Sequence, residues 1–210
     1  MSATARELMD RESSARSQPW PWIATALWLV AAAASLSIVW RYDPTPGVRA
    51  TAPERWPVSS ALARTSGTPT LILLAHPHCS CTPASLTELA EVLARASTRP
   101  RTYVLFLEPE GMANGWEQTS LWKTAAAIPG VTLVRDDDGL EAQRFGSATS
   151  GQTLLYDGGG ALRFNGGITG SRAHAGDNAG RRSLVALLGG DRAERAVTSV
   201  FGCPLFDAGL

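Results

Sequence analysis

An uncharged stretch near the N-terminus is the feature that most constrains how this chain can fold. Residues 22–40 read WIATALWLVAAAASLSIVW and contain no charged side chain. As an α-helix, this stretch would span roughly the 30 Å hydrocarbon core of a bilayer, at about 1.5 Å per residue. Tryptophan side chains stand at both of its ends, and such amphipathic rings prefer membrane interfaces. The stretch predicts a transmembrane helix, which leaves the rest of the chain to form a separate domain.

A cleaved signal peptide and a buried helix of a soluble protein are the alternatives to an uncleaved anchor. Ala31 to Ala34 supply the small residues that a signal-peptide cleavage site uses. The apolar run continues past them to Trp40, and a cleavage site would not need that continuation. The anchor is therefore the favoured interpretation.

Composition sets the remaining boundaries. Between residues 43 and 53, three prolines and a glycine interrupt any apolar periodicity, which indicates a linker. Arginines flank the apolar stretch about equally, so the positive-inside rule does not orient it, and long C-terminal domains translocate largely regardless of charge. We predict a cytoplasmic tail at 1–21, a transmembrane helix at 22–40, a linker at 41–54 and an exported domain at 55–210.

Charge and cysteine content exclude some classes of function. The chain has 19 basic and 19 acidic side chains, and its formal net charge is zero. Nucleic-acid binding requires a clustered basic surface, so we expect no nucleic-acid partner. Three cysteines are too few for a small fold held together by disulfides.

The predicted domain alternates apolar runs with amphipathic segments. Continuous apolar runs at 70–75 and 102–108 predict strands buried on both faces. Strands that alternate with helices predict parallel βαβ units, here closed by an antiparallel hairpin and a final helix. The other predicted elements are helices at 57–66, 83–96 and 116–128, a strand at 131–139, a short helix at 140–146, a hairpin at 152–167 and a helix from Asp177.

Two cysteines lie between the first apolar strand and the helix that follows it. Cys79 and Cys81 are one residue apart, and His76 and His78 precede them. A thiol near a helix N-terminus faces unsatisfied N–H groups and the positive end of the macrodipole, which stabilise its thiolate. The pair predicts redox chemistry that needs no cofactor. We expect Cys79 to be the more exposed, attacking thiol, although the macrodipole would act most strongly on Cys81.

Metal binding is the alternative function for the same segment. His76, His78, Cys79 and Cys81, with His174 from a later loop, offer imidazole and thiolate ligands that suit copper(I) or zinc. At an extended strand end, however, the two histidines face one way and Cys79 faces the other.

Other residues near the end of the chain and in the third predicted helix leave several interpretations open. Cys203 is a resolving thiol, a third metal ligand or a packed small residue. Trp116 and Trp122 lie close to one face of the helix predicted at 116–128 and indicate core packing.

The order of these features resembles the thioredoxin-like superfamily, in particular its membrane-anchored, exported thiol–disulfide oxidoreductases. The resemblance covers roughly residues 55–190 and rests on a buried strand, a cysteine motif, a proline-bearing helix and a later hairpin. The motifs HPHCSC (76–81) and GGITGSRAHAGDNAG (166–180) also resemble a small bacterial group labelled RedB. The resemblance implies a central mixed sheet with helices on both faces, and disulfide exchange with a protein partner.

The resemblance further implies where the protein works and what surrounds the cysteines. It places the chain in a bacterial inner membrane, with its domain in the periplasm or outside, and it brings Gly167, Ile168 and His174 towards the cysteines. The sequence departs from the superfamily at two points. Thioredoxins have two residues between their cysteines instead of one, and residues 149–153 lack the proline that the superfamily carries in cis at this place.

Overall fold

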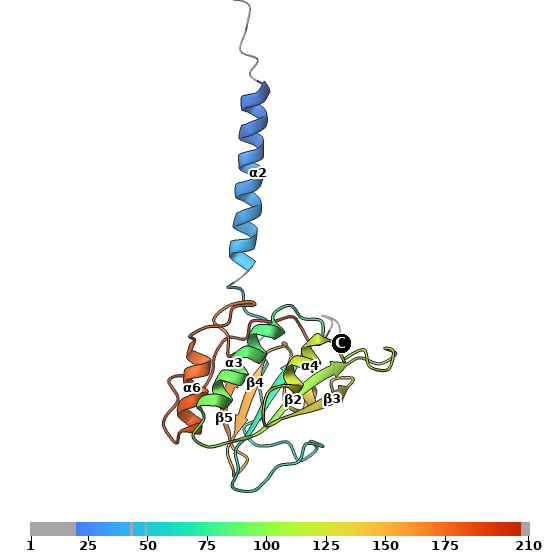
Figure 1. Ribbon diagram of the computed structural model, residues 1–210, viewed down its shortest axis with the longest axis vertical. Coiled ribbons are helices and arrows are strands. Elements are labelled where there is room, and N and C mark those ends of the chain that lie inside the picture. The colour runs from blue at the N-terminus through green and yellow to red at the C-terminus, as the bar shows by residue number, and fades with distance from the viewer. Residues whose placement is uncertain (1–19, 43, 49, 207–210) are drawn as a thin grey trace, which may run out of the picture. The chain divides into compact units, whose positions relative to one another are not determined.

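The computed structural model describes residues 20–42, 44–48 and 50–206, which belong to two compact units (Figure 1). One unit contains the N-terminal apolar helix, and the other begins at Pro44 and contains the sheet. The predicted cytoplasmic tail at 1–21 lies outside the described residues except for its last two positions.

Helix α2 (Trp20–Tyr42) is apolar on all sides and none of its residues is buried. Its 23 residues correspond to about 35 Å, which is enough to cross a bilayer. Hydroxyl groups within it donate to backbone carbonyls of the preceding turn, for example Thr25 to Pro21 and Ser35 to Ala31, each at 2.8 Å. Because the polar side chains are satisfied inside the helix, it suits a lipid environment. A signal sequence near the N-terminus can have the same length and apolar composition.

We expect α2 to remain in the mature protein. A helix that carries tryptophans at both ends is anchored at two interfaces, whereas a signal peptide is removed at a small-residue site. The intact mass of the protein extracted from membranes distinguishes the two. A mass that lacks the residues up to and including Ala34 would identify a signal peptide.

A five-stranded mixed sheet forms the centre of the second unit, in the order β3-β2-β1-β4-β5 (Figure 1). β1 pairs in parallel with β2, and β2 pairs in parallel with β3. β4 runs antiparallel to β1, and β5 antiparallel to β4. The strands are β1 (Thr70–Ala75), β2 (Arg101–Glu108), β3 (Val131–Asp137), β4 (Thr153–Tyr156) and β5 (Leu162–Gly166).

Helices cover both faces of this sheet, so the predicted fold class is confirmed. Alternate residues of β1 serve opposite faces: Leu71 and Leu73 pack with three helices, whereas Ile72 and Leu74 pack with a short one. Figure 1 shows the three helices together on one side of the sheet. They are α3 (Thr82–Arg95), α4 (Ser120–Ala126) and α6 (Ala179–Leu188), and the short helix on the other face is α5 (Leu140–Arg144).

Residues 57–66, which lie just before β1, form no helix, so the prediction of a helix there is wrong. The backbone just before them bonds to the β4–β5 hairpin: the Trp56 N–H donates to Gly160, and the Leu162 N–H donates to Glu54. Trp56 and the buried Leu62 complete the second core against α5 and the sheet. Pro57 and Gly67, which suggested the two ends of a helix, therefore lie in an extended segment.

The predicted linker also differs from the structure. Ala52 is buried in the second core, and the Tyr156 hydroxyl donates to the Pro53 carbonyl at 3.0 Å. Gly47 donates its N–H to Val200. The packed unit therefore begins at Pro44 and not at residue 55.

Candidate active site

The predicted cysteine site lies where β1 ends and α3 begins. After Ala75 the chain makes a tight turn, in which Cys79 donates its N–H to the His76 carbonyl and Thr82 donates to the Cys79 carbonyl, each at 3.1 Å. Cys81 stands at the N-cap position of α3, and Pro83 occupies its first turn. Both cysteines are thus at the carboxyl end of a central strand, as predicted.

Three thiols meet at this point. Cys79 is 2% exposed and Cys81 is 5% exposed, so the prediction that Cys79 is the more exposed thiol is wrong. The C-terminal segment brings the half-buried Cys203 to them, and its N–H donates to the Cys79 sulfur at 3.3 Å. All three cysteines are free thiols.

The surroundings of Cys79 favour its thiolate. Burial alone would raise the pKa of Cys79. Hydrogen bonds from the thiol and the N–H of Cys203 oppose this effect, with smaller contributions from the Cys81 backbone and the Thr82 hydroxyl. The balance lowers the pKa of Cys79 below its ordinary value, so a nucleophilic thiolate forms more readily there.

The other two thiols shift in the opposite direction. Burial raises the pKa of Cys81, and the nearby charge of Cys79 raises it further. Burial, followed by the hydrogen bond and the charge of Cys79, raises the pKa of Cys203 to about 12. Of the three thiols, Cys79 is therefore the one that ionises most readily.

The loop between β5 and α6 supplies two contacts that the sequence analysis did not identify. The Ala173 backbone and the Arg172 side chain hydrogen-bond to Cys81, and Arg172 also donates to the Gly202 carbonyl at 2.8 Å. Ala173 has φ +57°, a left-handed conformation that costs a non-glycine residue about 1–2 kcal/mol. Backbone strain is thus localised beside a thiol.

The loop borders the site as predicted, but through other residues. His174 is exposed, and its Nδ1 lies 2.7 Å from the Arg172 carbonyl. Ile168 is fully buried in the first core, and Gly167 packs closely against the backbone of Ser199. The only signal for Arg172 in the sequence was its position in this glycine-rich loop.

The two histidines face an aromatic side chain. Their rings lie 5.6 Å (His76) and 4.5 Å (His78) from that of Trp116, whereas Cys79 contacts Cys203. The divergence of the histidines from Cys79 was expected for an extended strand end, whereas residues 76–79 form a turn, so that reason is wrong. Trp116 was predicted to lie in a helix and to pack in the core. This is wrong, because α4 begins only at Ser120 and Trp116 contacts the two histidines instead. Trp122, in contrast, packs against Phe106 as predicted.

The ligand set proposed from the sequence does not gather around one point. Within residues 20–42, 44–48 and 50–206, no group of three or more His, Cys, Asp or Glu side chains is arranged to hold a metal ion.

Residues 149–153 lie at the place where the superfamily carries its cis-proline. No cis peptide bond occurs in the described parts of the chain. Ser150 instead connects three elements: its hydroxyl accepts from the His76 N–H at 2.9 Å, lies 3.1 Å from the Thr82 hydroxyl, and its N–H donates to the Cys203 carbonyl at 2.9 Å.

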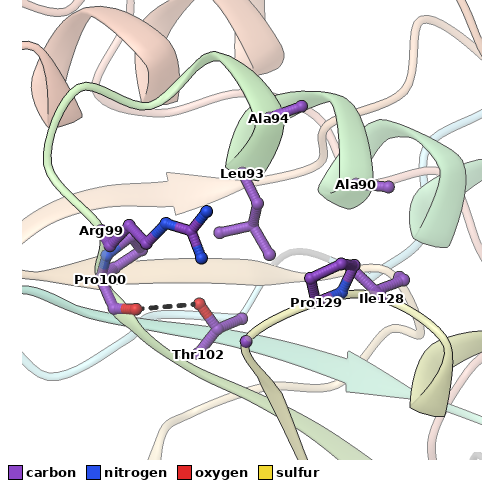
Figure 2. A pocket seen from close by; sticks show the side chains of 9 residues that line it. Ala90, Leu93, Ala94, Arg99, Pro100, Thr102, Ile128 and Pro129 are labelled. Atoms are coloured by element: carbon purple, nitrogen blue, oxygen red, sulfur yellow. Dashed lines mark hydrogen bonds between the residues drawn. The ribbon is translucent and has the colours of Figure 1, made fainter.

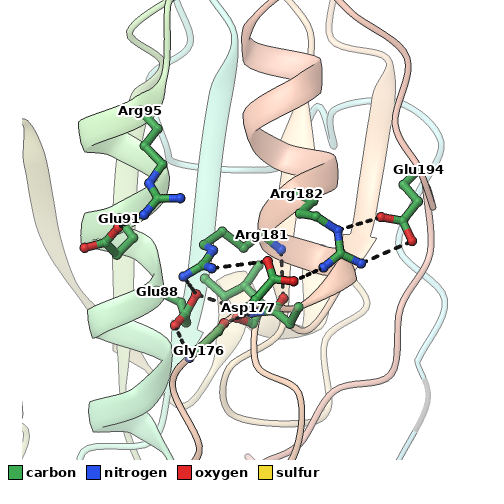
Figure 3. A network of polar contacts seen from close by, with 10 residues as sticks. Glu88, Glu91, Arg95, Gly176, Asp177, Arg181, Arg182 and Glu194 are labelled. Carbon is green, nitrogen blue, oxygen red and sulfur yellow. Dashed lines mark hydrogen bonds and ion pairs between the residues drawn. The ribbon is translucent and has the colours of Figure 1, made fainter.

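A buried carboxylate positions the loop that carries Arg172. Glu88 of α3 is 1% exposed and pairs with Arg181 of α6 at 3.0 Å (Figure 3). It also accepts from the Gly176 N–H at 2.6 Å and from the Asn178 side chain at 3.2 Å. The loop is therefore fixed at its far end, three residues after Ala173.

A pocket on the same face of the sheet lies away from the thiols. Figure 2 shows it beside α3 and the start of β2, with Leu93, Pro100 and Ile128 among its lining residues. Pro100 precedes β2, whereas the cysteines follow the end of β1. The two parallel strands place the pocket and the thiols at opposite edges of the sheet.

Two solved structures with TM-scores above 0.5 support the fold. An uncharacterised conserved protein from Geobacillus kaustophilus is 15% identical, with a TM-score of 0.53 over 80% of this chain and 95% of that one. A hypothetical protein from Sinorhizobium meliloti 1021 is 16% identical, with a TM-score of 0.53 over 79% and 100% of the two chains. An exposed lipoprotein thioredoxin of Streptococcus pneumoniae is 14% identical, with a TM-score of 0.43 over 60% and 86%.

At sequence identities this low, the similarity to these structures shows the fold alone. No protein-family model and no curated protein matches the sequence. The sheet order, the helix that follows β1 and the closing hairpin all agree with the resemblance found in the sequence. The unit that begins at Pro44 therefore has the thioredoxin-like fold, with three thiols at the carboxyl end of its central strand.

Proposed function

We propose that this protein exchanges thiols and disulfides with a protein partner, and that Cys79 of the CxC motif is the attacking thiolate. The observation that carries the proposal is the group of hydrogen-bond donors around one sulfur. The Cys79 sulfur accepts hydrogen bonds from the N–H and the thiol of Cys203, and further hydrogen bonds from the Cys81 backbone and the Thr82 hydroxyl. These donors lower its pKa even though the thiol is buried.

The exchange begins with attack of the Cys79 thiolate on one sulfur of a disulfide in the partner. The S–S bond of the partner breaks, a Cys79–partner mixed disulfide forms, and the second partner sulfur leaves as a thiolate. A second thiol of this chain then releases the partner, and the resemblance to thioredoxins implies Cys81, the second cysteine of the motif, for this role. The exported side of a bacterial inner membrane is the proposed location, because disulfides persist there.

We expect Cys79 and one further cysteine to form a reversible couple. Full-length protein in detergent is equilibrated with glutathione buffers of graded potential, quenched with acid and alkylated. Two thiols should become protected together, because an internal disulfide consumes both in one step. Three thiols that all stay alkylatable under strong oxidant would contradict the exchange, and metal analysis of the purified protein would then test copper or zinc binding.

A further inference from the structure

The C-terminal segment forms a short strand-like pairing directly over Cys79. The Ser150 N–H donates to Cys203 at 2.9 Å, the Leu205 N–H donates to Ala148 at 2.8 Å, and Thr149 and Pro204 form an antiparallel bridge. Leu205 is buried in the second core. This pairing sets the position of the Cys203 backbone, whose N–H reaches the Cys79 sulfur.

Close packing reinforces the position. A side chain at Gly202 would place its Cβ 1.9 Å from the Ser150 carbonyl oxygen, so only glycine permits this approach. Arg172 donates to the Gly202 carbonyl and also hydrogen-bonds to Cys81. The segment that carries Cys203 is thus held from both sides of the cysteine site.

We infer that Cys203 is the thiol that resolves the mixed disulfide at Cys79, so that the internal disulfide of the oxidised protein joins Cys79 and Cys203. The inference rests on the proposed function and replaces Cys81 as the second thiol. The oxidant that forms this internal disulfide is the disulfide of the partner. Sulfur of Cys203 attacks sulfur of Cys79, the bond from Cys79 to the partner breaks, and the partner leaves as a thiolate.

The charges around Cys79 change in the direction this step requires. While Cys79 is a thiolate, its charge and its hydrogen bond help to raise the pKa of Cys203, which stays protonated. A mixed disulfide carries no charge on Cys79, so both of these effects vanish, and burial and the charge of Cys81 are the causes that still raise the pKa of Cys203. The positive charge of Arg172 favours the Cys203 thiolate. The proton of the Cys203 thiol passes to solvent. Attachment of the partner therefore lowers the pKa of the resolving thiol relative to the reduced protein.

Cys81 is less suited to this bond, although it also lies near Cys79. The two residues belong to one tight turn, closed by the Thr82 N–H, and Cys81 has helical dihedral angles (φ −86°, ψ −21°). The Cys81 thiol hydrogen-bonds to Cys79. A disulfide between residues two apart would nevertheless close a small, strained ring, so that bond requires the turn to open. Cys203 comes from another segment and carries no such constraint.

Oxidised glutathione serves as the disulfide probe for this inference. Reduced full-length protein in detergent is treated with it and quenched with acid, and intact mass and peptide mapping locate each adduct. The Cys203→Ser variant should accumulate the Cys79 adduct at least about tenfold over wild type, because resolution is lost. The matched Cys81→Ser variant should resemble wild type, and oxidised wild type should yield a Cys79–Cys203 linked peptide.

The outcomes separate the two proposals. A Cys79 adduct that accumulates in Cys81→Ser but not in Cys203→Ser, with a Cys79–Cys81 linked peptide in wild type, overturns the inference and leaves the exchange intact. An absence of any Cys79 adduct in wild type and in both variants overturns the exchange itself. The linked peptide of wild type decides the matter even if a variant folds poorly.

Discussion

Replacement of Cys79 by serine is expected to lower the rate of disulfide exchange at least about a hundredfold, because a serine hydroxyl forms no comparable nucleophile at neutral pH. The rate is the loss of reduced full-length protein in oxidised glutathione, to either an adduct or an internal disulfide, followed by intact mass. Cys81→Ser is the matched control, since it removes a thiol from the same turn while the Cys79 surroundings stay in place. Loss of the rate in Cys81→Ser, with Cys79→Ser near wild type, would exchange the two roles.

The pH profile gives the same prediction a second readout. Thiolate is the reacting form, so the alkylation rate at Cys79 rises with pH and levels off above its pKa. Since that pKa is lowered in the folded protein, the plateau should begin at a lower pH than for the same cysteine in denaturant. A folded-state midpoint at or above the denatured one would contradict the proposed role of the hydrogen bonds around the sulfur.

Replacement of Glu88 by alanine should destabilise the domain by about 3–5 kcal/mol, because it removes the buried carboxylate that pairs with the nearly buried Arg181 and leaves this arginine only the exposed Asp177. Glu88 is 1% exposed, and the Arg181 side chain that pairs with it is 12% exposed. The variant also removes the acceptor of the Gly176 N–H. Urea unfolding of the full-length protein, followed by circular dichroism, measures the free energy.

Glu91→Ala is the matched control on the same helix. Glu91 pairs with Arg95 at 2.7 Å, but both side chains are about half exposed, so its removal should cost about 0–1 kcal/mol. Comparable losses from the two variants would show that burial of Glu88 contributes nothing. A larger loss for Glu88→Ala, together with faster alkylation of Cys81, would confirm that the carboxylate positions the Arg172 loop.

The central strands and the cysteine site could be predicted because their signals are local. Continuous apolar runs identified β1 and β2, which are buried on both faces, and the proline in the first turn identified the start of α3. The place of Cys79 follows from those two elements. The helix expected at 57–66 was wrong because a proline at the start and a glycine beyond the end also fit an extended segment. Of its residues, Leu62 packs into the second core while Val58 is exposed. The neighbouring backbone of Glu54 and Trp56 pairs with a hairpin.

The remaining parts of the site depend on contacts between distant residues. Cys203 lies 124 positions after Cys79, and no local pattern near it indicates that its backbone would reach that sulfur. Trp116 reaches the histidines because α4 begins late, at the Thr119 cap, so that the tryptophan lies in the preceding turn. Arg172 lies in a loop whose course is set by Glu88 on another helix.

The near-complete burial of Cys79 under the C-terminal segment also makes its chemistry a measure of local motion. Because this sulfur is 2% exposed, we expect a reagent to reach it only in the fraction of molecules in which the surrounding chain has opened, for example where residues 202–205 separate from Ser150. When reclosing is fast, the observed alkylation rate is the rate of an open thiolate multiplied by that fraction. Each 1.4 kcal/mol or so of opening free energy therefore slows the reaction about tenfold. The alkylation rate of Cys79 thus reports local opening of the chain around it, and the free energy of that opening can be measured without any added label.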